Sequence, residues 1–237
     1  MSEPGSRSRR RAEGVLRKAG IWALDYLYAA RHQVRAAFSR DDPGMLAAGR
    51  PGASTVLLLP GILETWRFML PLARHLHARG HAVHVVAALG RNGSTIGDGA
   101  DRVAAYLAEH DLTGVNIVAH SKGGLIAKQL MASSPEGARV RLAVAVSTPF
   151  AGSVYARYLP TRSLRSLAPT DAALLRLAAE SAANERIVSV FGWFDPHIPG
   201  GSALAGARNV ELPVGGHFRI LASRELLEVV DACVDGG

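Results

Sequence analysis

Apolar and polar positions alternate in blocks from residue 55 to the C-terminus, a pattern that predicts strands alternating with helices. Short apolar runs typical of buried strands cover residues 55–59, 82–87, 115–119, 140–146, 186–191 and 209–212. Helical periodicity covers residues 64–79, 100–110, 121–133 and 218–233 between and after them. This alternation favours an α/β fold with a mainly parallel sheet of about six strands and helices on both faces.

Two segments depart from this rhythm and suggest the domain organisation. Residues 150–185 contain only short helical pieces, among them 171–182, and we interpret them as a small cap. A stretch rich in Pro and Gly at 41–54 separates the repeating part from what precedes it. We therefore expect an N-terminal arm at residues 1–45 and an α/β domain at residues 46–237.

The arm combines a polar start with a helical pattern. Residues 1–11 are Arg-rich and expected to be disordered, whereas residues 12–38 predict a helix. Its apolar positions fall at steps of three and four, on one face. They are Val15, Ala19, Trp22, Tyr26, Ala30, Val34 and Phe38. We favour a helix docked on the body through this aromatic face, over an amphipathic helix on an anionic membrane and over a nucleic-acid-binding arm.

The distribution of charge supports this division and excludes some partners. The net charge is +7 over 237 residues, but residues 1–40 hold nine Arg or Lys and three acids, which leaves only +1 for the rest. A nearly neutral body argues against nucleic acid as a partner. The sequence has neither the continuous apolar run of a membrane-spanning helix nor a signal peptide. We expect a cytoplasmic protein, with membrane contact through residues 12–38 as the alternative.

Candidate chemistry concentrates at residues 115–127, where an apolar run stops at Ser121 and two glycines precede a helical run. Strand, sharp turn and helix with a serine at the apex is the pattern of a nucleophile elbow. The crowded turn needs small residues two positions before and after the serine, and here these are Ala119 and Gly123. An ordinary strand-to-helix turn with a capping serine is the alternative.

Four features together resemble the α/β-hydrolase family, in particular its small bacterial lipase and esterase branch. They are the turn at 59–62, the elbow at 119–123, the Ser-Thr-Pro-Phe-Ala-Gly-Ser stretch at 147–153 and a late Asp…His pair. The resemblance covers about residues 54–233 and implies the α/β-hydrolase fold. It also implies a catalytic triad in the chain order Ser121, Asp195, His217, each just past a predicted strand.

Physical arguments support these assignments. An un-ionised serine needs a base, and glycines around His217 let its loop bring an imidazole over the sheet edge. His197 is the second choice of base, because it lies only two residues from the candidate acid. We expect the side chain of His120, next to the nucleophile, to point elsewhere. Asp195 orients the imidazole, although an Asp before Pro is also a common turn former, and Asp171 is the reserve acid.

The resemblance also implies an oxyanion hole and a pocket. Its donors are the backbone N–H groups of Ile62 and Lys122, and Pro60 stands where many relatives have histidine. Several aromatic residues near the expected active-site loops are candidates to line an acyl pocket, with ordinary core packing as the alternative. These pocket candidates are Trp66, Phe68, Phe150 and Trp193.

Metal and cofactor chemistry find little support. Four histidines fall within residues 75–84, but the helical spacing of the first two makes them diverge, so we expect no metal site. The single cysteine, Cys233, rules out an intrachain disulfide and a cysteine-based metal site. The Gly-rich stretch at 90–99 lacks the Gly-Lys-Ser/Thr ending of a phosphate loop, and we expect no cofactor.

These observations predict a serine hydrolase that cleaves small-molecule or lipid carboxylic esters through an acyl-enzyme. A thioesterase, an amidase or an acyltransferase would use the same triad. A catalytically silent α/β-hydrolase-fold protein that binds a membrane or a partner is the alternative from another class. The sequence leaves the acyl chain length and the oligomeric state open.

Overall fold

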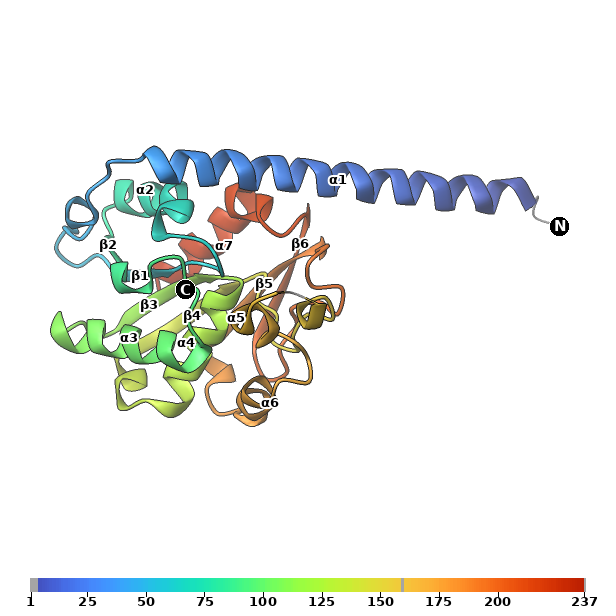
Figure 1. Cartoon of the computed structure of the whole chain (residues 1–237). Helices are drawn as coiled ribbons and strands as arrows, with labels where there is room; N and C mark the ends of the chain where they lie inside the picture. Colours follow the sequence, from blue (N-terminus) through green and yellow to red (C-terminus); the bar gives the residue numbers. More distant parts are fainter. Residues whose placement is uncertain (1–3, 159, 237) are drawn as a thin grey trace.

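A parallel sheet forms the centre of the computed structural model, which describes residues 4–158 and 160–236 (Figure 1). Within this part of the chain the sheet has six strands in the order β2-β1-β3-β4-β5-β6, and all neighbours are parallel. The strands are β1 (Thr55–Leu59), β2 (Ala82–Val85), β3 (Val115–His120), β4 (Val140–Val146), β5 (Ile187–Phe194) and β6 (Arg208–Gly215). The predicted fold class is confirmed.

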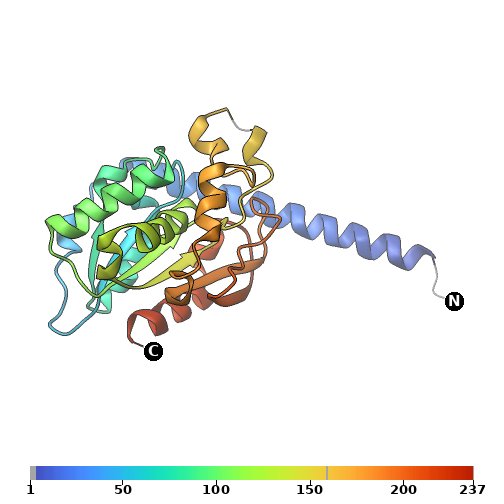
Figure 2. The same cartoon turned by 90° about the horizontal axis from the view of Figure 1, so that it is seen from below.

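Helices cover both faces of the sheet, as Figures 1 and 2 show. The helices are α1 (Pro4–Phe38), α2 (Leu70–Ala78), α3 (Ile96–Glu109), α4 (Lys122–Ser133), α5 (Arg162–Arg165), α6 (Ala172–Ala179) and α7 (Arg224–Val234). Apolar residues of α3, α4 and α6 share one buried cluster with one face of the sheet. Those of α2 and α7 share a second cluster with the other face. Two buried layers explain why the central strands are buried on both faces and mainly apolar.

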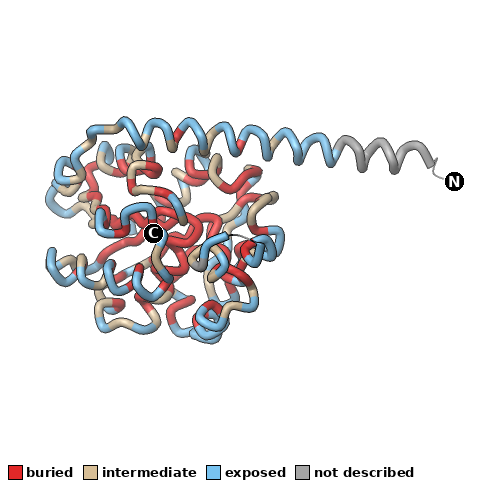
Figure 3. Tube along the Cα trace, in the orientation of Figure 1, coloured by how far each residue is buried: buried red, intermediate tan, exposed pale blue. Residues whose placement is uncertain are grey.

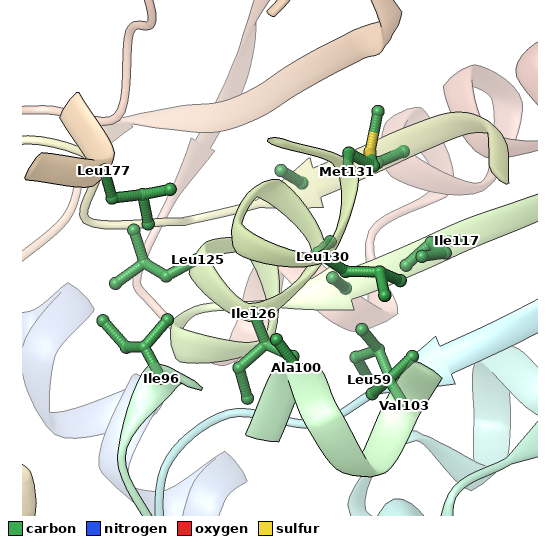
Figure 4. Close-up of a cluster of buried hydrophobic side chains, with 14 of the residues drawn as sticks. Leu59, Ile96, Ala100, Val103, Ile117, Leu125, Ile126, Leu130, Met131 and Leu177 are labelled. Carbon is green, nitrogen blue, oxygen red and sulfur yellow. The ribbon is translucent and has the colours of Figure 1, made fainter. Parts of the chain in front are cut away.

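The first cluster packs the elbow helix α4 against the sheet and against α3 (Figure 4). Side chains of β3 alternate in direction, so that Ile117 joins this cluster and Val118 joins the other. A methyl group on Gly99 of α3 would lie 2.6 Å from Cδ1 of Ile126, so a larger residue would require the Ile126 side chain to move. Gly99 therefore allows α3 and α4 to approach closely.

The order of the strands places a crevice at one edge of the sheet, where a functional site can form. From β1 the chain runs outward to β2 and then returns to place β3 on the other side of β1. Connections that leave in opposite directions open a crevice at the carboxyl ends of the two strands. Register pairs Leu59 with Ala119, so the loops after β1 and β3 begin at the same level.

Several element boundaries differ from the predicted ones. Helix α3 begins at Ile96 instead of near residue 100, because Thr95 and Asp98 form a capping box that the surrounding glycines obscured. Strand β6 is longer than predicted and contains Pro213. It tolerates proline because it is the edge strand of the sheet. The predicted helix at 171–182 is shorter, with Asp171 as the N-cap of α6.

Two predicted helices are each divided into a 3-10 turn and an α-helix. Residues 64–79 form Trp66–Met69 and then α2, whose second residue is Pro71. Residues 218–233 form Arg219–Ala222 and then α7, which starts after the capping Ser223. Proline and serine favour new helix starts, which explains both divisions.

The N-terminal helix differs most from expectation. It begins at Pro4, so residues 4–11 are helical where disorder was predicted, and residues 1–3 lie outside the described residues. Figure 2 shows α1 crossing the molecule and extending beyond it. Among the described residues, no helix has the length and apolar character that spanning a membrane requires.

The predicted docking face of α1 is wrong. Val15, Val34 and Phe38 are exposed, and Trp22 and Tyr26 are half exposed. The helix instead packs on the body through the face that carries Ile21, Asp25, Tyr28, Ala29 and His32. The apolar periodicity correctly indicated that α1 has an apolar face. The helix packs on the body through a different face, because the buried Asp25 carboxylate on that face binds the backbone of residues 217–219.

Candidate active site

Ser121 lies at a strained turn between β3 and α4. Its backbone φ is 51°, in the left-handed region that side chains rarely adopt, and its N–H donates to the Val146 carbonyl at 2.8 Å. A side chain at Gly123 would collide with the Leu59 carbonyl, so glycine is required there. The Ala119 side chain is fully buried in the sheet and is accommodated. The turn therefore has the conformation of a nucleophile elbow with alanine in place of the first glycine.

The three predicted triad side chains form one hydrogen-bonded chain. His217 Nδ1–H donates to Asp195 Oδ2 at 2.7 Å, and Ser121 Oγ–H donates to His217 Nε2 at 3.1 Å. All three residues are buried. A neutral imidazole with its proton on Nδ1 leaves Nε2 free to accept the serine proton, which is the arrangement a general base needs.

Backbone donors and the imidazole keep the acid ionised. Asp195 Oδ1 accepts the N–H groups of His197 at 2.8 Å and Ile198 at 3.2 Å. Burial alone would raise the pKa of Asp195, but the charge and hydrogen bond of His217 and the backbone donors outweigh it and lower this pKa. Burial and the neighbouring His217 lower the pKa of His197 to about 4, so His197 is neutral near pH 7.

A carboxylate from α1 holds the backbone of the histidine loop. Asp25 is fully buried and accepts three backbone N–H groups, from His217 at 2.9 Å, Phe218 at 2.9 Å and Arg219 at 2.8 Å. These amides begin the 3-10 turn Arg219–Ala222, where unpaired donors are normally left. The N-terminal helix therefore positions the loop that carries the candidate base.

A second buried pair holds the same loop from the other side. His120 Nε2–H donates to the His217 carbonyl at 3.0 Å, and its Nδ1–H donates to Glu64 Oε2 at 3.0 Å. Burial alone would lower the pKa of His120, but the Glu64 carboxylate outweighs it and raises this pKa. The prediction that His120 points away from the nucleophile agrees with this geometry.

Glu64 also connects this pair to the loop after β1. Its Oε2 accepts the Gly61 N–H at 2.7 Å, and a methyl group on Gly61 would lie 2.9 Å from that oxygen and 3.0 Å from His120 Nδ1. Glycine is thus needed because the carboxylate and the imidazole occupy the space beside it. One buried network joins the loop that carries Ile62 to the loop that carries His217.

The two predicted oxyanion donors begin adjacent loops. Ile62 follows β1 by three residues, and Lys122 is the first residue of α4, where helical amides lack intrahelical acceptors. Within the described part of the chain, neither backbone N–H donates to another protein group. Both amides are therefore available to bind a negative charge that forms beside Ser121.

The Lys122 side chain points away from the serine and braces the neighbouring loops. Its Nζ donates to the carbonyls of Asn92, at 2.9 Å, and Ser94. Asn92 Nδ2–H in turn donates to the Pro60 carbonyl at 2.7 Å. Burial lowers the pKa of Lys122 to about 8. The hydrogen bond from Asn92 anchors Pro60, the residue at which the turn after β1 departs from the pattern of the α/β-hydrolase family.

A cavity of about 560 Å³ opens onto Ser121 and His217. Its wall is mostly apolar and comes from α1 and from the loops that follow β1, β4, β5 and β6. Trp22 and Tyr26 of α1 line it together with Tyr155 and Leu164. A cavity of this size and polarity suits an acyl chain or another apolar group next to the serine.

The four aromatic residues predicted to line this pocket do not border it. Trp66 and Phe68 are buried in the cluster under α2, and Phe150 is buried in the cluster under α4. Trp193 lies at the end of β5, under the Arg17 guanidinium at 4.5 Å from its ring centre. Their proximity in sequence to active-site loops was misleading, because side chains next to a loop can point into the core.

The remaining candidates lie apart from Ser121. Asp171 caps α6 and accepts the N–H groups of Ala173 and Leu174. Of the four clustered histidines, His75 contacts Asp231 and His84 contacts Tyr106, so they face different partners. Within the described residues, no group of three His, Cys, Asp or Glu side chains is arranged to hold a metal ion.

Replacing Asp25 with alanine is expected to lower the free energy of unfolding by about 3 kcal/mol, because three backbone donors lose a charged acceptor. Urea denaturation followed by circular dichroism measures this. Asp171→Ala is the matched control, since it removes a partly exposed helix cap that accepts two N–H groups and should cost about 1 kcal/mol. Equal losses in the two variants would contradict the anchoring role of Asp25.

Comparison with solved structures relates the fold to known hydrolases. The mature lipase BlEst2 from Bacillus licheniformis superimposes with a TM-score of 0.63 at 17% identity, over 78% of this chain and 92% of that one. The type II thioesterase BorB from the borrelidin biosynthetic cluster gives 0.54 at 18% identity, over 79% and 94%.

One neighbour also covers the N-terminal helix. A membrane phospholipase A, described as a novel bacterial virulence factor, gives a TM-score of 0.56 at 18% identity, over 96% of this chain and 98% of that one. No family model and no curated protein matches the sequence. At these identities the likeness shows the fold, and the chain has the α/β-hydrolase fold that was predicted.

Proposed function

We propose that this chain, which has the α/β-hydrolase fold, is a serine hydrolase that cleaves carboxylic esters. One observation carries the proposal: Ser121, His217 and Asp195 form a continuous hydrogen-bonded relay at an apolar cavity. The solved neighbours include a lipase, a thioesterase and a phospholipase by their own descriptions, which supports hydrolysis of an acyl bond as the reaction class.

In the first half of the reaction, Ser121 Oγ attacks the acyl carbonyl while its proton passes to His217 Nε2. The Asp195 carboxylate stabilises the imidazolium that forms and stays ionised. The tetrahedral oxyanion binds the N–H groups of Ile62 and Lys122, and each such donor contributes about 2.7–4 kcal/mol of transition-state stabilisation. The ester bond then breaks, and the alcohol leaves with the proton from His217.

In the second half, water attacks the acyl-enzyme. His217 Nε2 takes a proton from the water, and a second tetrahedral intermediate forms in the same oxyanion hole. Its collapse returns the proton to Ser121 Oγ and releases the carboxylic acid. The bonds from Asp25 and His120 to the backbone of residue 217 hold the imidazole in place through both halves.

The apolar wall of the cavity indicates an acyl chain longer than acetate as the preferred substrate. Each buried methylene contributes about 0.8 kcal/mol, so burial of the four extra methylenes should raise kcat/KM about 200-fold from p-nitrophenyl acetate to p-nitrophenyl hexanoate. Hydrolysis rates over this ester series test the prediction. A preference for acetate would contradict an acyl-binding cavity.

A matched set of hexanoyl substrates distinguishes the esterase from its rivals. The p-nitrophenyl ester, a thioester and an anilide present the same acyl chain with different leaving groups. We expect the ester to give the highest kcat/KM. Faster hydrolysis of the thioester would assign the site to a thioesterase, and no turnover by the folded protein would favour the catalytically silent alternative.

A further inference from the structure

The side of α1 that faces away from the body is apolar. Its residues recur at steps of seven and four, which places them on one side of the helix. They are Leu16, Ala23, Leu27, Val34 and Phe38, and we call them the outer apolar face. Leu16, Leu27, Val34 and Phe38 are 72%, 65%, 57% and 82% exposed. Figure 3 shows this side of α1 as mostly exposed. A helix that only covers a protein would carry polar residues there.

The orientation of α1 is determined by its buried side, so the outer apolar face cannot turn inward. Asp25 accepts its three backbone bonds from the histidine loop, and Gln33 Nε2–H donates to the Leu63 carbonyl at 3.1 Å. Tyr28 and Ala29 pack against the apolar cluster beneath. Rotation of the helix would break all of these contacts, so the outer face needs a partner outside the molecule.

Charge identifies the partner. Between residues 14 and 38, α1 exposes four cations, Arg17, Lys18, Arg31 and Arg35. The one acid in that range, Asp25, is fully buried. Pairing of two α1 helices along residues 14–38 would bring like charges together with no exposed acid in that range to neutralise them. Arg17 and Lys18 lie over the rings of Trp193 and Phe194. An anionic lipid surface complements the apolar face together with Arg31 and Arg35, whose long stems can reach the headgroups.

Helix α1 also lines the active-site cavity. Trp22 and Tyr26, each 49% exposed, lie on α1 and border the cavity. Leu63 and Tyr155 are 46% and 53% exposed and border it too. A surface that binds α1 would therefore lie beside the entrance to the cavity.

We propose that α1 docks the protein on an anionic membrane surface, with the outer apolar face in the boundary between headgroups and acyl chains. The helix lies along the membrane, because its opposite side is occupied by the body of the protein. Arg31 and Arg35 bind headgroup phosphates from the flank of the helix. The cavity mouth then opens at the lipid surface. This docking does not depend on the proposed hydrolase activity.

Sedimentation with phosphatidylcholine vesicles, with and without phosphatidylglycerol, tests the proposal. We expect the wild type to bind the anionic vesicles more tightly and to lose affinity as salt is added. The double variant Leu27→Glu with Val34→Glu should bind at least about tenfold more weakly, because it places two charges in the apolar face. Arg31→Glu with Arg35→Glu should remove the preference for the anionic vesicles.

The matched control is Leu175→Glu on α6, a residue 55% exposed on the opposite face of the sheet, which should leave binding unchanged. Circular dichroism and thermal unfolding verify that each variant is folded. Absence of wild-type binding, or equal binding by the Leu27→Glu, Val34→Glu variant, would overturn the proposal. So would a dimer in light scattering that this double variant makes monomeric while vesicle binding persists, which would assign the face to a second copy of the chain. Sedimentation needs no turnover, so an inactive site would not affect the result.

Discussion

Replacing Ser121 with alanine is expected to lower kcat for ester hydrolysis by about 10⁶-fold, because it removes the nucleophile on which the other two groups act. The oxyanion amides and the cavity remain, so a residual rate above that of water is expected. The variant should be at least as stable as the wild type, since Ser121 Oγ makes its hydrogen bond only to His217 within the described residues. Steady-state hydrolysis of p-nitrophenyl hexanoate and urea denaturation measure the two quantities.

Ser134→Ala provides the control for this variant. Ser134 caps the 3-10 helix Pro135–Arg139 behind α4 and does not border the cavity. It should change kcat by less than about twofold, while costing about 1 kcal/mol of stability. If Ser121→Ala kept a substantial part of the wild-type kcat, another group would be the nucleophile.

The second large effect is expected from Asp195→Asn, which should lower kcat by about 10⁴-fold with little change in KM. The side-chain amide that replaces the Asp195 carboxylate would donate to His217 Nδ1. It would therefore favour the imidazole tautomer that carries the ring proton on Nε2. Ser121 would then lose its proton acceptor. Asp231→Asn is the matched control, because Asp231 also pairs with a histidine, His75 at 2.9 Å, away from the cavity. A similar loss in both variants would contradict the specific role of Asp195.

The same variant has a testable effect on the pH dependence of stability. The fold lowers the pKa of Asp195, so its ionised form stabilises the protein above the unfolded pKa, about 4. This contribution is lost as the pH falls through the folded-state pKa. The difference in unfolding free energy between wild type and Asp195→Asn should therefore shrink on acidification below about pH 4. A difference independent of pH would contradict the shift.

The relay residues could be located from the sequence because each follows a strand with a recognisable apolar run. The resemblance to the α/β-hydrolase family implied the triad order Ser121, Asp195, His217, and a parallel sheet agrees with it because the carboxyl ends of its strands lie at one edge. The alternation of strands and helices could be predicted from the apolar runs, whereas the order of the strands within the sheet was not predicted. The boundaries were less predictable, since a capping box at Thr95 or an edge position for Pro213 depends on a few hydrogen bonds.

The residues that hold the histidine loop could not be predicted. Asp25 stands 192 residues before His217, and Glu64 stands 56 residues before His120. No local pattern connects such pairs. One signal was available: Asp25 is the single acid between residues 14 and 38, in an otherwise apolar and basic stretch, and an acid in that position needs a partner. The partner itself becomes visible only in the fold.

The role of the N-terminal helix could not be predicted from the spacing of its apolar residues either. A pattern of apolar positions shows that a helix has an apolar face, but not whether protein or another phase covers it. Here the buried side contains Asp25 and His32, whereas Leu27 and Phe38 face outward. The resemblance to the hydrolase family covered residues 54–233, so the contribution of Trp22 and Tyr26 to the cavity could not be derived from it.

Labelling by a serine-directed fluorophosphonate tests the central claim most directly, because the reagent reacts only with an activated serine and its site can be mapped by peptide mass spectrometry. We predict a single label on Ser121 in the wild type and no label in Ser121→Ala. Slower labelling is expected for Asp195→Asn. A folded wild-type protein that takes no label, or one labelled on a different serine, would contradict the account.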